Sequence, residues 1–142
     1  MTLVIEDASI RDLDKLYEIE MKCFQKEAFS KQQIANLLSG YNSVSLVVKV
    51  KGEIVGFIVG MMLFERNLLV GRILTVDVSP TYRRKGVAQK FLQEIEKIFK
   101  EKGAKACRLE VREDNVAALR LYQKLGYKKV GILKNYYENA HG

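Results

Sequence analysis

The sequence has one histidine, His141, which lies next to the last residue. This scarcity nearly excludes Ser–His and Cys–His catalysis and histidine-rich metal sites, so a catalyst here must use carboxylate, phenol, amine or backbone groups. Cysteine is almost as rare, since Cys23 and Cys107 are the only two. Neither has a partner at metal-ligand spacing, and the pattern therefore predicts buried free thiols and no metal site.

Long apolar runs are also missing. No stretch approaches the length that spans a bilayer, and the first seven residues lack the basic start and apolar core of a signal peptide. We therefore expect a cytoplasmic protein without a membrane partner. The 142 residues are 48% hydrophobic and 29% charged, which suits one core, so residues 1–142 are expected to form a single domain.

Positive charge is in excess, with a formal net charge of +7. Such a balance favours an anionic partner, and nucleic acid is the default expectation from charge alone. However, Arg83–Lys85 is a tight cluster and not a long stripe interleaved with aromatic residues. It favours a phosphate-bearing cofactor, with no nucleic acid required. Other lysines are expected to form a solvated face, namely Lys97, Lys100, Lys102, Lys105 and Lys128.

Apolar periodicity and turn residues predict six strands and four helices in the order β-α-α-β-β-β-α-β-α-β. This order indicates a mixed sheet covered by helices in one layered α/β domain. The predicted strands cover residues 3–5, 43–50, 54–64, 70–78, 106–111 and 127–133. The predicted helices lie between residues 9 and 24, 30 and 40, 87 and 102, and 114 and 126.

The stretch from Val76 to Ala88 runs from an apolar strand, through a basic glycine turn, into an amphipathic helix. Such a turn points several unpaired N–H groups at one spot, where the helix dipole favours negative charge. Arg83, Arg84 and Lys85 crowd the same turn. A solvated helix start in which Gly86 only relaxes the turn would look similar. The turn favours a polyphosphate ligand.

A second motif, L-E-V-R-x-x-N-x-x-A-x-x-L-Y-x-x-L-G-Y, runs from Leu109 to Tyr127. Together with R-x-x-G-x-A at Arg83–Ala88, it closely resembles the N-terminal protein acetyltransferases of the GNAT superfamily, including the ribosomal-protein alanine acetyltransferases and their archaeal counterparts. The resemblance implies a mixed, mostly antiparallel twisted sheet flanked by helices on both faces. It also implies direct acetyl transfer from acetyl-CoA to the N-terminal α-amine of proteins or peptides, with ribosomal proteins among the candidate substrates.

Two residues of this motif are candidate catalysts. Glu110 is a carboxylate inside an apolar strand, where burial favours the neutral form and suits the group to base work. It could equally lie on a solvent face, since Arg108, Glu110 and Arg112 share one side of the strand. Tyr122 lies on the side of its helix that faces the protein core. It is either an ordinary buried tyrosine or a phenol able to protonate a departing thiolate. The resemblance implies that Glu110 is the general base and Tyr122 the general acid.

The resemblance also implies the cofactor contacts. Pantetheine would pair with the backbone of the strand, the pyrophosphate would bind the glycine turn, and Asn115 would both cap a helix and contact the cofactor. The implied residues are Val76, Asp77, Val78, Arg83, Arg84, Lys85, Gly86, Val87, Ala88, Gln89 and Asn115.

A peptide groove is implied as well, with Phe24, Glu27 and Phe29 on one wall. Tyr136 and Tyr137 match a pair that related enzymes use to hold the first substrate amides, although two aromatics anchoring a loop would look the same. Relatives continue after this pair with an acidic turn and one more strand, which this sequence lacks. We therefore expect an unpaired sheet edge and an incomplete groove wall.

Two other functions fit the same residues. One is acetylation of lysine side chains or small amines, and the other is binding of CoA or RNA without catalysis. A steep salt dependence without saturation by acetyl-CoA would indicate RNA binding.

Overall fold

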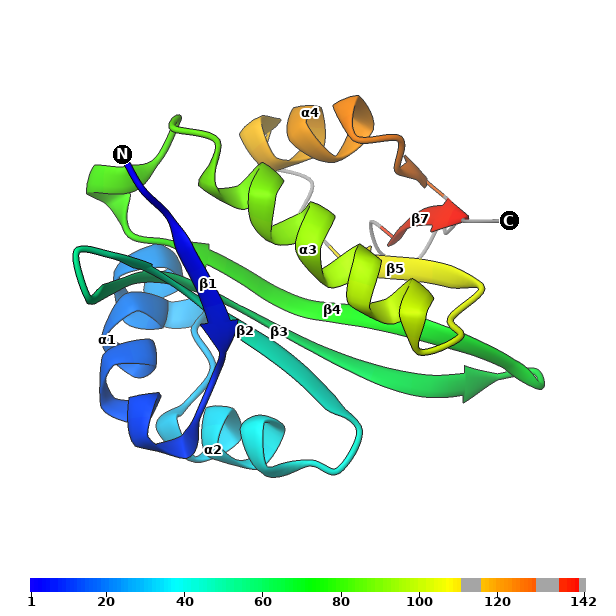
Figure 1. The fold of residues 1–142 in the computed structure, drawn as a ribbon, viewed down its shortest axis with the longest axis horizontal. Coiled ribbons are helices and arrows are strands. Elements are labelled where there is room, and N and C mark those ends of the chain that lie inside the picture. The colour runs from blue at the N-terminus through cyan, green and yellow to red at the C-terminus, as the bar shows by residue number, and fades with distance from the viewer. Residues whose placement is uncertain (111–115, 130–135, 141–142) are drawn as a thin grey trace.

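The computed structural model describes residues 1–110, 116–129 and 136–140. These residues form one twisted sheet in the strand order β1-β2-β3-β4-β5-β7-β6, in which β4 and β5 are parallel and all other neighbours antiparallel (Figure 1). The predicted mixed, mostly antiparallel fold is confirmed. The strands are β1 (Val4–Asp7), β2 (Ser43–Val50), β3 (Glu53–Glu65), β4 (Leu68–Val78), β5 (Ala106–Glu110), β6 (Lys128–Lys129) and β7 (Tyr136–Ala140).

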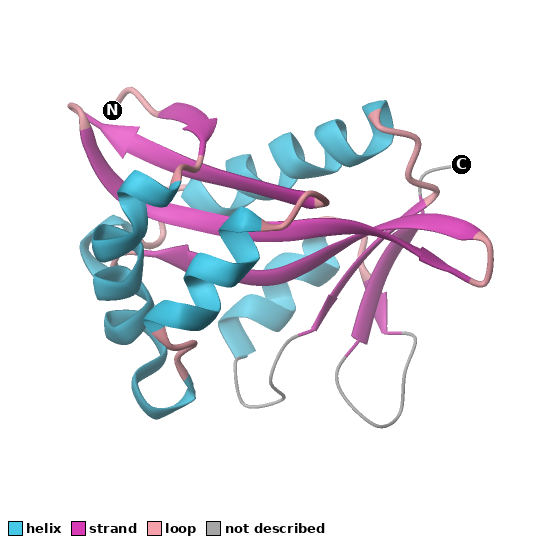
Figure 2. Ribbon diagram, turned by 90° about the horizontal axis from the view of Figure 1, so that it is seen from below, coloured by secondary structure: helices cyan, strands magenta, loops and turns pink. Residues whose placement is uncertain are grey.

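Helices cover both faces of the sheet, as expected (Figure 2). The α-helices are α1 (Leu13–Phe24), α2 (Lys31–Ser39), α3 (Val87–Glu101) and α4 (Val116–Lys124), and short 3₁₀ turns cover η1 (Ile10–Asp12), η2 (Gln25–Glu27) and η3 (Pro80–Tyr82). Helices α1 and α2 pack on one face, and α3 and α4 on the other, because β2 and β3 together point apolar side chains into two separate cores. No helix in these ranges is both long and apolar enough to cross a membrane.

Serine caps start the first two helical segments, as the sequence predicts. The hydroxyl of Ser9 accepts the Arg11 N–H, and the Asp12 carboxylate accepts the Ser9 N–H, so the capping box is complete. Ser30 and Gln33 form the same reciprocal pair at the start of α2. Each box satisfies N–H groups that the first turn leaves without a helical acceptor. The helix after Ser9 begins as η1, one tight turn before α1.

Helix α3 lies close to the centre of the sheet because two glycines make room for it. Phe91, Leu92 and Phe99 are buried on its apolar stripe. A Cβ atom at Gly71 would lie 2.2 Å from the Phe99 ring, and one at Gly60 would lie 2.8 Å from it. The helix that begins at the glycine turn is therefore held firmly on the sheet.

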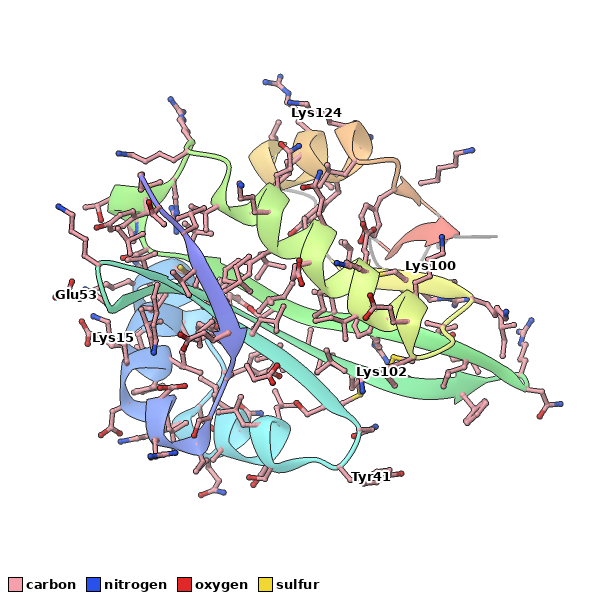
Figure 3. All side chains as sticks on the ribbon, in the orientation of Figure 1. Lys15, Tyr41, Glu53, Lys100, Lys102 and Lys124 are labelled. Atoms are coloured by element: carbon pink, nitrogen blue, oxygen red, sulfur yellow. The ribbon has the colours of Figure 1, made fainter. Side chains whose placement is uncertain are left out.

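The predicted surface lysines are exposed, and Figure 3 shows Lys100 and Lys102 at the end of α3.

A bulge in β4 reverses the direction in which its side chains point. Val59 of β3 pairs with Thr75, but Gly60 pairs with Ile73, so Leu74 is an extra residue. Before the bulge, Ile73 packs in the core under α3; after it, Val76 packs there too. Thr75 and Asp77 consequently face α1. The bulge thus places polar side chains of β4 on the α1 face.

The far edge of the sheet differs from the expectation. β7 pairs with β5 along its whole length, so the prediction of an unpaired edge was wrong. The predicted strand over residues 127–133 appears as Lys128–Lys129, and residues 130–135 lie outside the described ranges. Tyr136 and Tyr137 lie in β7 and pair with Glu110 and Leu109. Their backbone is therefore part of the sheet and not of a loop before it.

The two cysteines are free, as predicted, although only Cys107 is fully buried and Cys23 is half-buried. The Cys107 thiol lies 3.3 Å from the Tyr127 hydroxyl, and burial raises its pKa to about 12. Cys107 is therefore an inert core thiol at neutral pH.

Candidate active site

The glycine turn between β4 and α3 presents backbone N–H groups to solvent. Gly86 is the N-cap of α3 and adopts the left-handed conformation, with φ of 78°. It has no side chain to accept the N–H groups of the first helical turn, and a Cβ atom there would meet nothing within 4 Å. Gly86 is exposed and its surroundings are open, so an anion can approach the start of α3, where the helix dipole is positive.

Arg84 is strained in the same turn. It is left-handed with φ of 61°, a conformation that L-residues other than glycine, asparagine and aspartate rarely adopt. Lys51, Arg66 and Asn67 are also left-handed, but they lie in the hairpin turns between β2 and β3 and between β3 and β4. Strain outside such turns clusters at functional sites. The exposed Arg84 and Lys85 add positive charge to the turn.

Arg83 has a different position from its two neighbours. Its Nε donates to the carbonyl oxygen of Val78 at 3.2 Å, so the side chain folds back on the end of β4. The same oxygen accepts the thiol of Cys23 at 3.4 Å. Arg83 therefore joins the turn to the strand, and any contact with a cofactor would come in addition to this bond.

We expect substitution of Gly86 by leucine to reduce the thermal shift that acetyl-CoA produces. A ligand that binds only the folded state stabilises it by about 2.7 kcal/mol at a hundred times its Kd, and a bulky side chain at the turn would block the approach of the pyrophosphate. Gly52→Leu is a matched control, because Gly52 has φ of 81° and equally open surroundings but lies in a hairpin turn. Differential scanning fluorimetry measures both. Equal thermal shifts with acetyl-CoA in the two variants would contradict the assignment of the glycine turn as the pyrophosphate site.

β4 and β5 separate beside this turn. Their parallel pairing ends at Ile73 and Leu109, whereas β4 continues to pair with β3 as far as Val78. Within the described residues, the β5-facing edge of Val76–Val78 thus has no ladder partner. Backbone groups on this edge can pair with an extended ligand, as in β-strand addition. The structure therefore places the predicted pantetheine-binding segment next to the predicted pyrophosphate turn.

The two candidate catalysts lie on the elements that border this gap. Glu110 follows Leu109, the last residue of β5 paired with β4, and its backbone pairs with Tyr136. Tyr122 of α4 is buried, as predicted, with its ring centroid 6.0 Å from that of Tyr127. Burial, and secondarily the charge of Asp77, raise the pKa of Tyr122 to about 12, so the phenol keeps its proton at neutral pH. Asn115 and the side chains of Glu110, Tyr136 and Tyr137 lie outside the described structure.

The predicted peptide wall reaches the end of the same strand. Phe24 ends α1, and Gln25 next to it has φ of 50° and ψ of −113°. Phe24 and Phe29 are half-buried and Glu27 is exposed. The bond from the Cys23 thiol to Val78 ties this segment to β4. The structure thus brings the candidate peptide wall and the candidate cofactor strand together. Gln25, in this wall, is like Arg84 a non-glycine residue that has a positive φ outside a hairpin turn.

Sequence reasoning missed the buried polar residues between α1 and β4. Glu20 and the side chains of Thr75 and Asp77 are buried there, and Thr75 Oγ1 lies at hydrogen-bonding distance from Asp77 Oδ1, 2.6 Å away. A signal was present: Glu20 lies four residues after the buried Leu16, on the apolar stripe of α1. For Asp77 the sequence predicts only a backbone contact with the cofactor.

Among the described residues only β4 and β5 pair in parallel, and a basic helix start lies beside the point where they separate, which is the arrangement that the resemblance to CoA-dependent acetyltransferases implies. The chain belongs to the GNAT acetyltransferase family, because the model of that family matches residues 13–127. The predicted family is confirmed, and with it the prediction of an acetyl-CoA-dependent N-acetyltransferase.

Relatives are similar over nearly the whole chain. An N-alpha-acetyltransferase of Sulfurisphaera tokodaii is 32% identical, over 96% of this chain and 86% of that protein. The ribosomal protein bS18-alanine N-acetyltransferase of Haemophilus influenzae is 30% identical, over 98% of this chain and 90% of that protein. A PaiA N-acetyltransferase of Thermoplasma acidophilum, solved in complex with coenzyme A, has a TM-score of 0.85 at 23% identity, over 99% of this chain and 100% of that one. The last comparison supports the fold.

Proposed function

We propose that this protein transfers the acetyl group of acetyl-CoA to the N-terminal α-amine of proteins or peptides. The observation that carries the proposal is the separation of β4 from β5 beside the glycine turn. Relatives named N-alpha-acetyltransferase and bS18-alanine N-acetyltransferase support this amine as acceptor and ribosomal proteins as candidate substrates. The enzyme is expected to act in the cytoplasm.

The cofactor would bind along the edge of β4 and across the turn. The unpaired edge of Val76–Val78 offers backbone groups to pantetheine, and residues 84–89 with the start of α3 offer N–H groups and positive charge to the pyrophosphate. Acetyl-CoA supplies the thioester and its acyl carbon. The chain supplies orientation, which holds the amine and the thioester at reacting distance.

Three groups of the chain would then handle protons and charge. Glu110 accepts a proton from the α-ammonium, directly or through a water, and the free amine attacks the thioester carbonyl. A backbone N–H of the Val76–Val78 segment stabilises the negative charge on that oxygen. Tyr122 donates its proton to the sulfur as the C–S bond breaks, the nitrogen loses its second proton to solvent as the amide forms, and Tyr122 regains a proton from solvent while Glu110 releases its own. The products are the acetylated amine and the CoA thiol, with no covalent enzyme intermediate.

The peptide would enter between the Cys23–Phe29 segment and β7. Phe24, Glu27 and Phe29 lie on the first side, and Tyr136 and Tyr137 on the second. Main-chain bonds to the first peptide units would leave specificity to a small pocket for the first residue.

The acceptor amine gives a direct test. At neutral pH an α-amine, with a pKa of about 7.7–8.0, is far more often a free base than lysine, with a pKa of about 10.4. We expect peptides beginning with small residues or methionine to be acetylated at the N-terminus. N-terminally blocked peptides with an internal lysine should react much more slowly. Mass spectrometry of a peptide library with acetyl-CoA measures both, and faster transfer to the blocked peptides would overturn the substrate assignment.

A further inference from the structure

Two carboxyl groups that the proposed acetyl transfer does not use are buried side by side between α1 and β4. Glu20 is 1% exposed and Asp77 is 0% exposed. The Thr75 hydroxyl lies between them, with Oγ1 2.6 Å from Asp77 Oδ1 and 3.4 Å from Glu20 Oε1. In the described part of the chain, Asp77 Oδ2 has no hydrogen-bond partner. Two ionised carboxylates here would lose their hydration and repel each other.

The number of hydrogen atoms available also indicates that the two carboxyl groups are not both ionised. The Thr75 hydroxyl has one hydrogen, so it can donate to only one of the two carboxyl groups. One additional proton satisfies both: Asp77 Oδ1 donates to Thr75 Oγ1, and Thr75 donates to Glu20 Oε1. Burial, followed by the hydrogen bond and charge of Glu20, raises the pKa of Asp77 well above its ordinary value. Glu20 also accepts the N–H of Phe29, whereas Asp77 Oδ2 has no hydrogen-bond partner among the described residues, so the extra proton belongs on Asp77.

Other titratable groups around Asp77 are consistent with a neutral side chain there. Arg83 lowers the pKa of Asp77, but it is exposed and its charge is screened by solvent. Burial, and then the charge of Asp77, raise the pKa values of Cys23 on α1 and Tyr122 on α4. An ionised Asp77 would thus make Tyr122 a weaker acid. A neutral Asp77 suits the proposed transfer of the Tyr122 proton.

Glu20, Thr75 and Asp77 form a polar row that also holds the peptide wall in place. Glu20 Oε2 accepts the backbone N–H of Phe29 at 2.8 Å. Cys23 is bound to the Val78 carbonyl at the other end of the segment. The Cys23–Phe29 segment is thereby fixed to β4 at one end and, at the other, to Glu20 of α1, which in turn contacts Thr75 of β4. Its position depends on Glu20 remaining an acceptor toward both Phe29 and Thr75.

We propose that Glu20, Thr75 and Asp77 share one proton at neutral pH and that Glu20 and Asp77 are positioning residues, which hold the Cys23–Phe29 segment against the cofactor strand. The effect on catalysis rests on the proposed function, whereas the proton itself does not. Loss of the proton places a second negative charge in the row and loosens the segment. Peptide binding then weakens, and acetyl-CoA binding at the glycine turn remains.

Two isosteric variants separate these states. In Asp77→Asn the amide donates to Thr75, which still donates to Glu20, so the row keeps its direction without a titrating proton. In Glu20→Gln the amide oxygen still accepts the Phe29 N–H, but the amide nitrogen faces Thr75 as a donor. Thr75 must then donate to Asp77, which favours the ionised form of Asp77. Glu18→Gln is the matched control, because Glu18 lies on the same helix with a half-exposed side chain and pairs with Lys22 at 3.1 Å.

The proton is tested without cofactor or peptide. Infrared spectroscopy at neutral pH should show the carbonyl stretch of one neutral carboxylic acid, which shifts with ¹³C-labelled aspartate and disappears in Asp77→Asn. The pH dependence of the free energy of unfolding should give the same answer. The raised pKa of Asp77 stabilises the fold below the unfolded pKa of about 3.9, and this stability is lost as pH rises, so wild type should lose stability relative to Asp77→Asn. Absence of the band, or a shift only with labelled glutamate, would overturn the shared proton on Asp77.

The positioning role is tested by peptide kinetics. In wild type we expect KM for the peptide to rise as pH passes through the titration of Asp77, while Asp77→Asn shows no such rise. In Glu20→Gln we expect KM to be raised roughly fivefold already at neutral pH, because a charge-assisted bond to Phe29 becomes a neutral one. Its acetyl-CoA thermal shift and the kinetics of Glu18→Gln should match wild type. If wild type, Asp77→Asn and Glu20→Gln had identical pH profiles of the peptide KM, the positioning role would be overturned. If none of these proteins acetylated peptides, the proposed function itself would be contradicted.

Discussion

Replacing Tyr122 with phenylalanine is expected to lower kcat by about 10²–10⁴-fold, the usual contribution of a general acid. The phenol keeps its proton at neutral pH because burial raises the pKa of Tyr122 to about 12. It is therefore available to the departing thiolate, and phenylalanine fills the same space without it. The acetyl-CoA thermal shift should be retained, because the glycine turn is unchanged. Steady-state kinetics with a saturating peptide measures the loss.

Tyr127→Phe is the matched control for this variant. Tyr127 is buried beside Tyr122, and its hydroxyl contacts the Cys107 thiol at 3.3 Å. Its removal costs buried hydrogen bonding, about 0.5–1.5 kcal/mol of stability for each bond lost, but should leave kcat near the wild-type value. Equal kcat values for the two variants would make Tyr122 an ordinary core tyrosine.

Glu110→Gln is expected to reduce kcat by a similar factor, about 10²–10⁴-fold at neutral pH. Glutamine preserves the size of the side chain but cannot accept the ammonium proton. The loss should shrink as pH rises, because the α-amine, with a pKa of about 7.7–8.0, then arrives already deprotonated. A pH–rate profile of wild type and variant measures this convergence.

Glu53→Gln provides the comparison, since Glu53 lies at the start of a strand on the exposed surface (Figure 3). It should follow the wild-type profile at every pH. If Glu110→Gln lost the same factor at all pH values, Glu110 would be needed for structure or binding and not as the base.

The sequence predicts the parts of this fold that local chemistry determines. The serine caps at Ser9 and Ser30, the apolar stripe of α3 and the glycine turn all depend on residues within one or two turns of each other. The cofactor side of the candidate site is predictable for the same reason. Its strand and its turn are consecutive in the chain.

Features that join distant segments were not predictable in this way. The contact of Glu20 with Thr75 spans 55 residues, and the pairing of β5 with β7 depends on where the chain returns to the sheet. The bulge at Leu74 adds to the difficulty, because simple alternation would place Ile73 and Val76 on opposite faces. Period-2 patterning therefore predicts the strand but misplaces half of its side chains.

The extra residue in β4 also affects how this strand can tolerate change. A substitution at Leu74 alters one partly buried apolar contact. If the same residues of β4 paired regularly with β3, without the bulge, strict alternation would turn the carboxyl group of Asp77 toward the apolar stripe of α3, far from its hydroxyl and carboxyl partners. The unpaired backbone edge at the end of the strand would shift its hydrogen-bonding phase at the same time. The place of Asp77 beside α1 therefore depends on the irregular pairing at Leu74 and not on the identity of the Leu74 side chain.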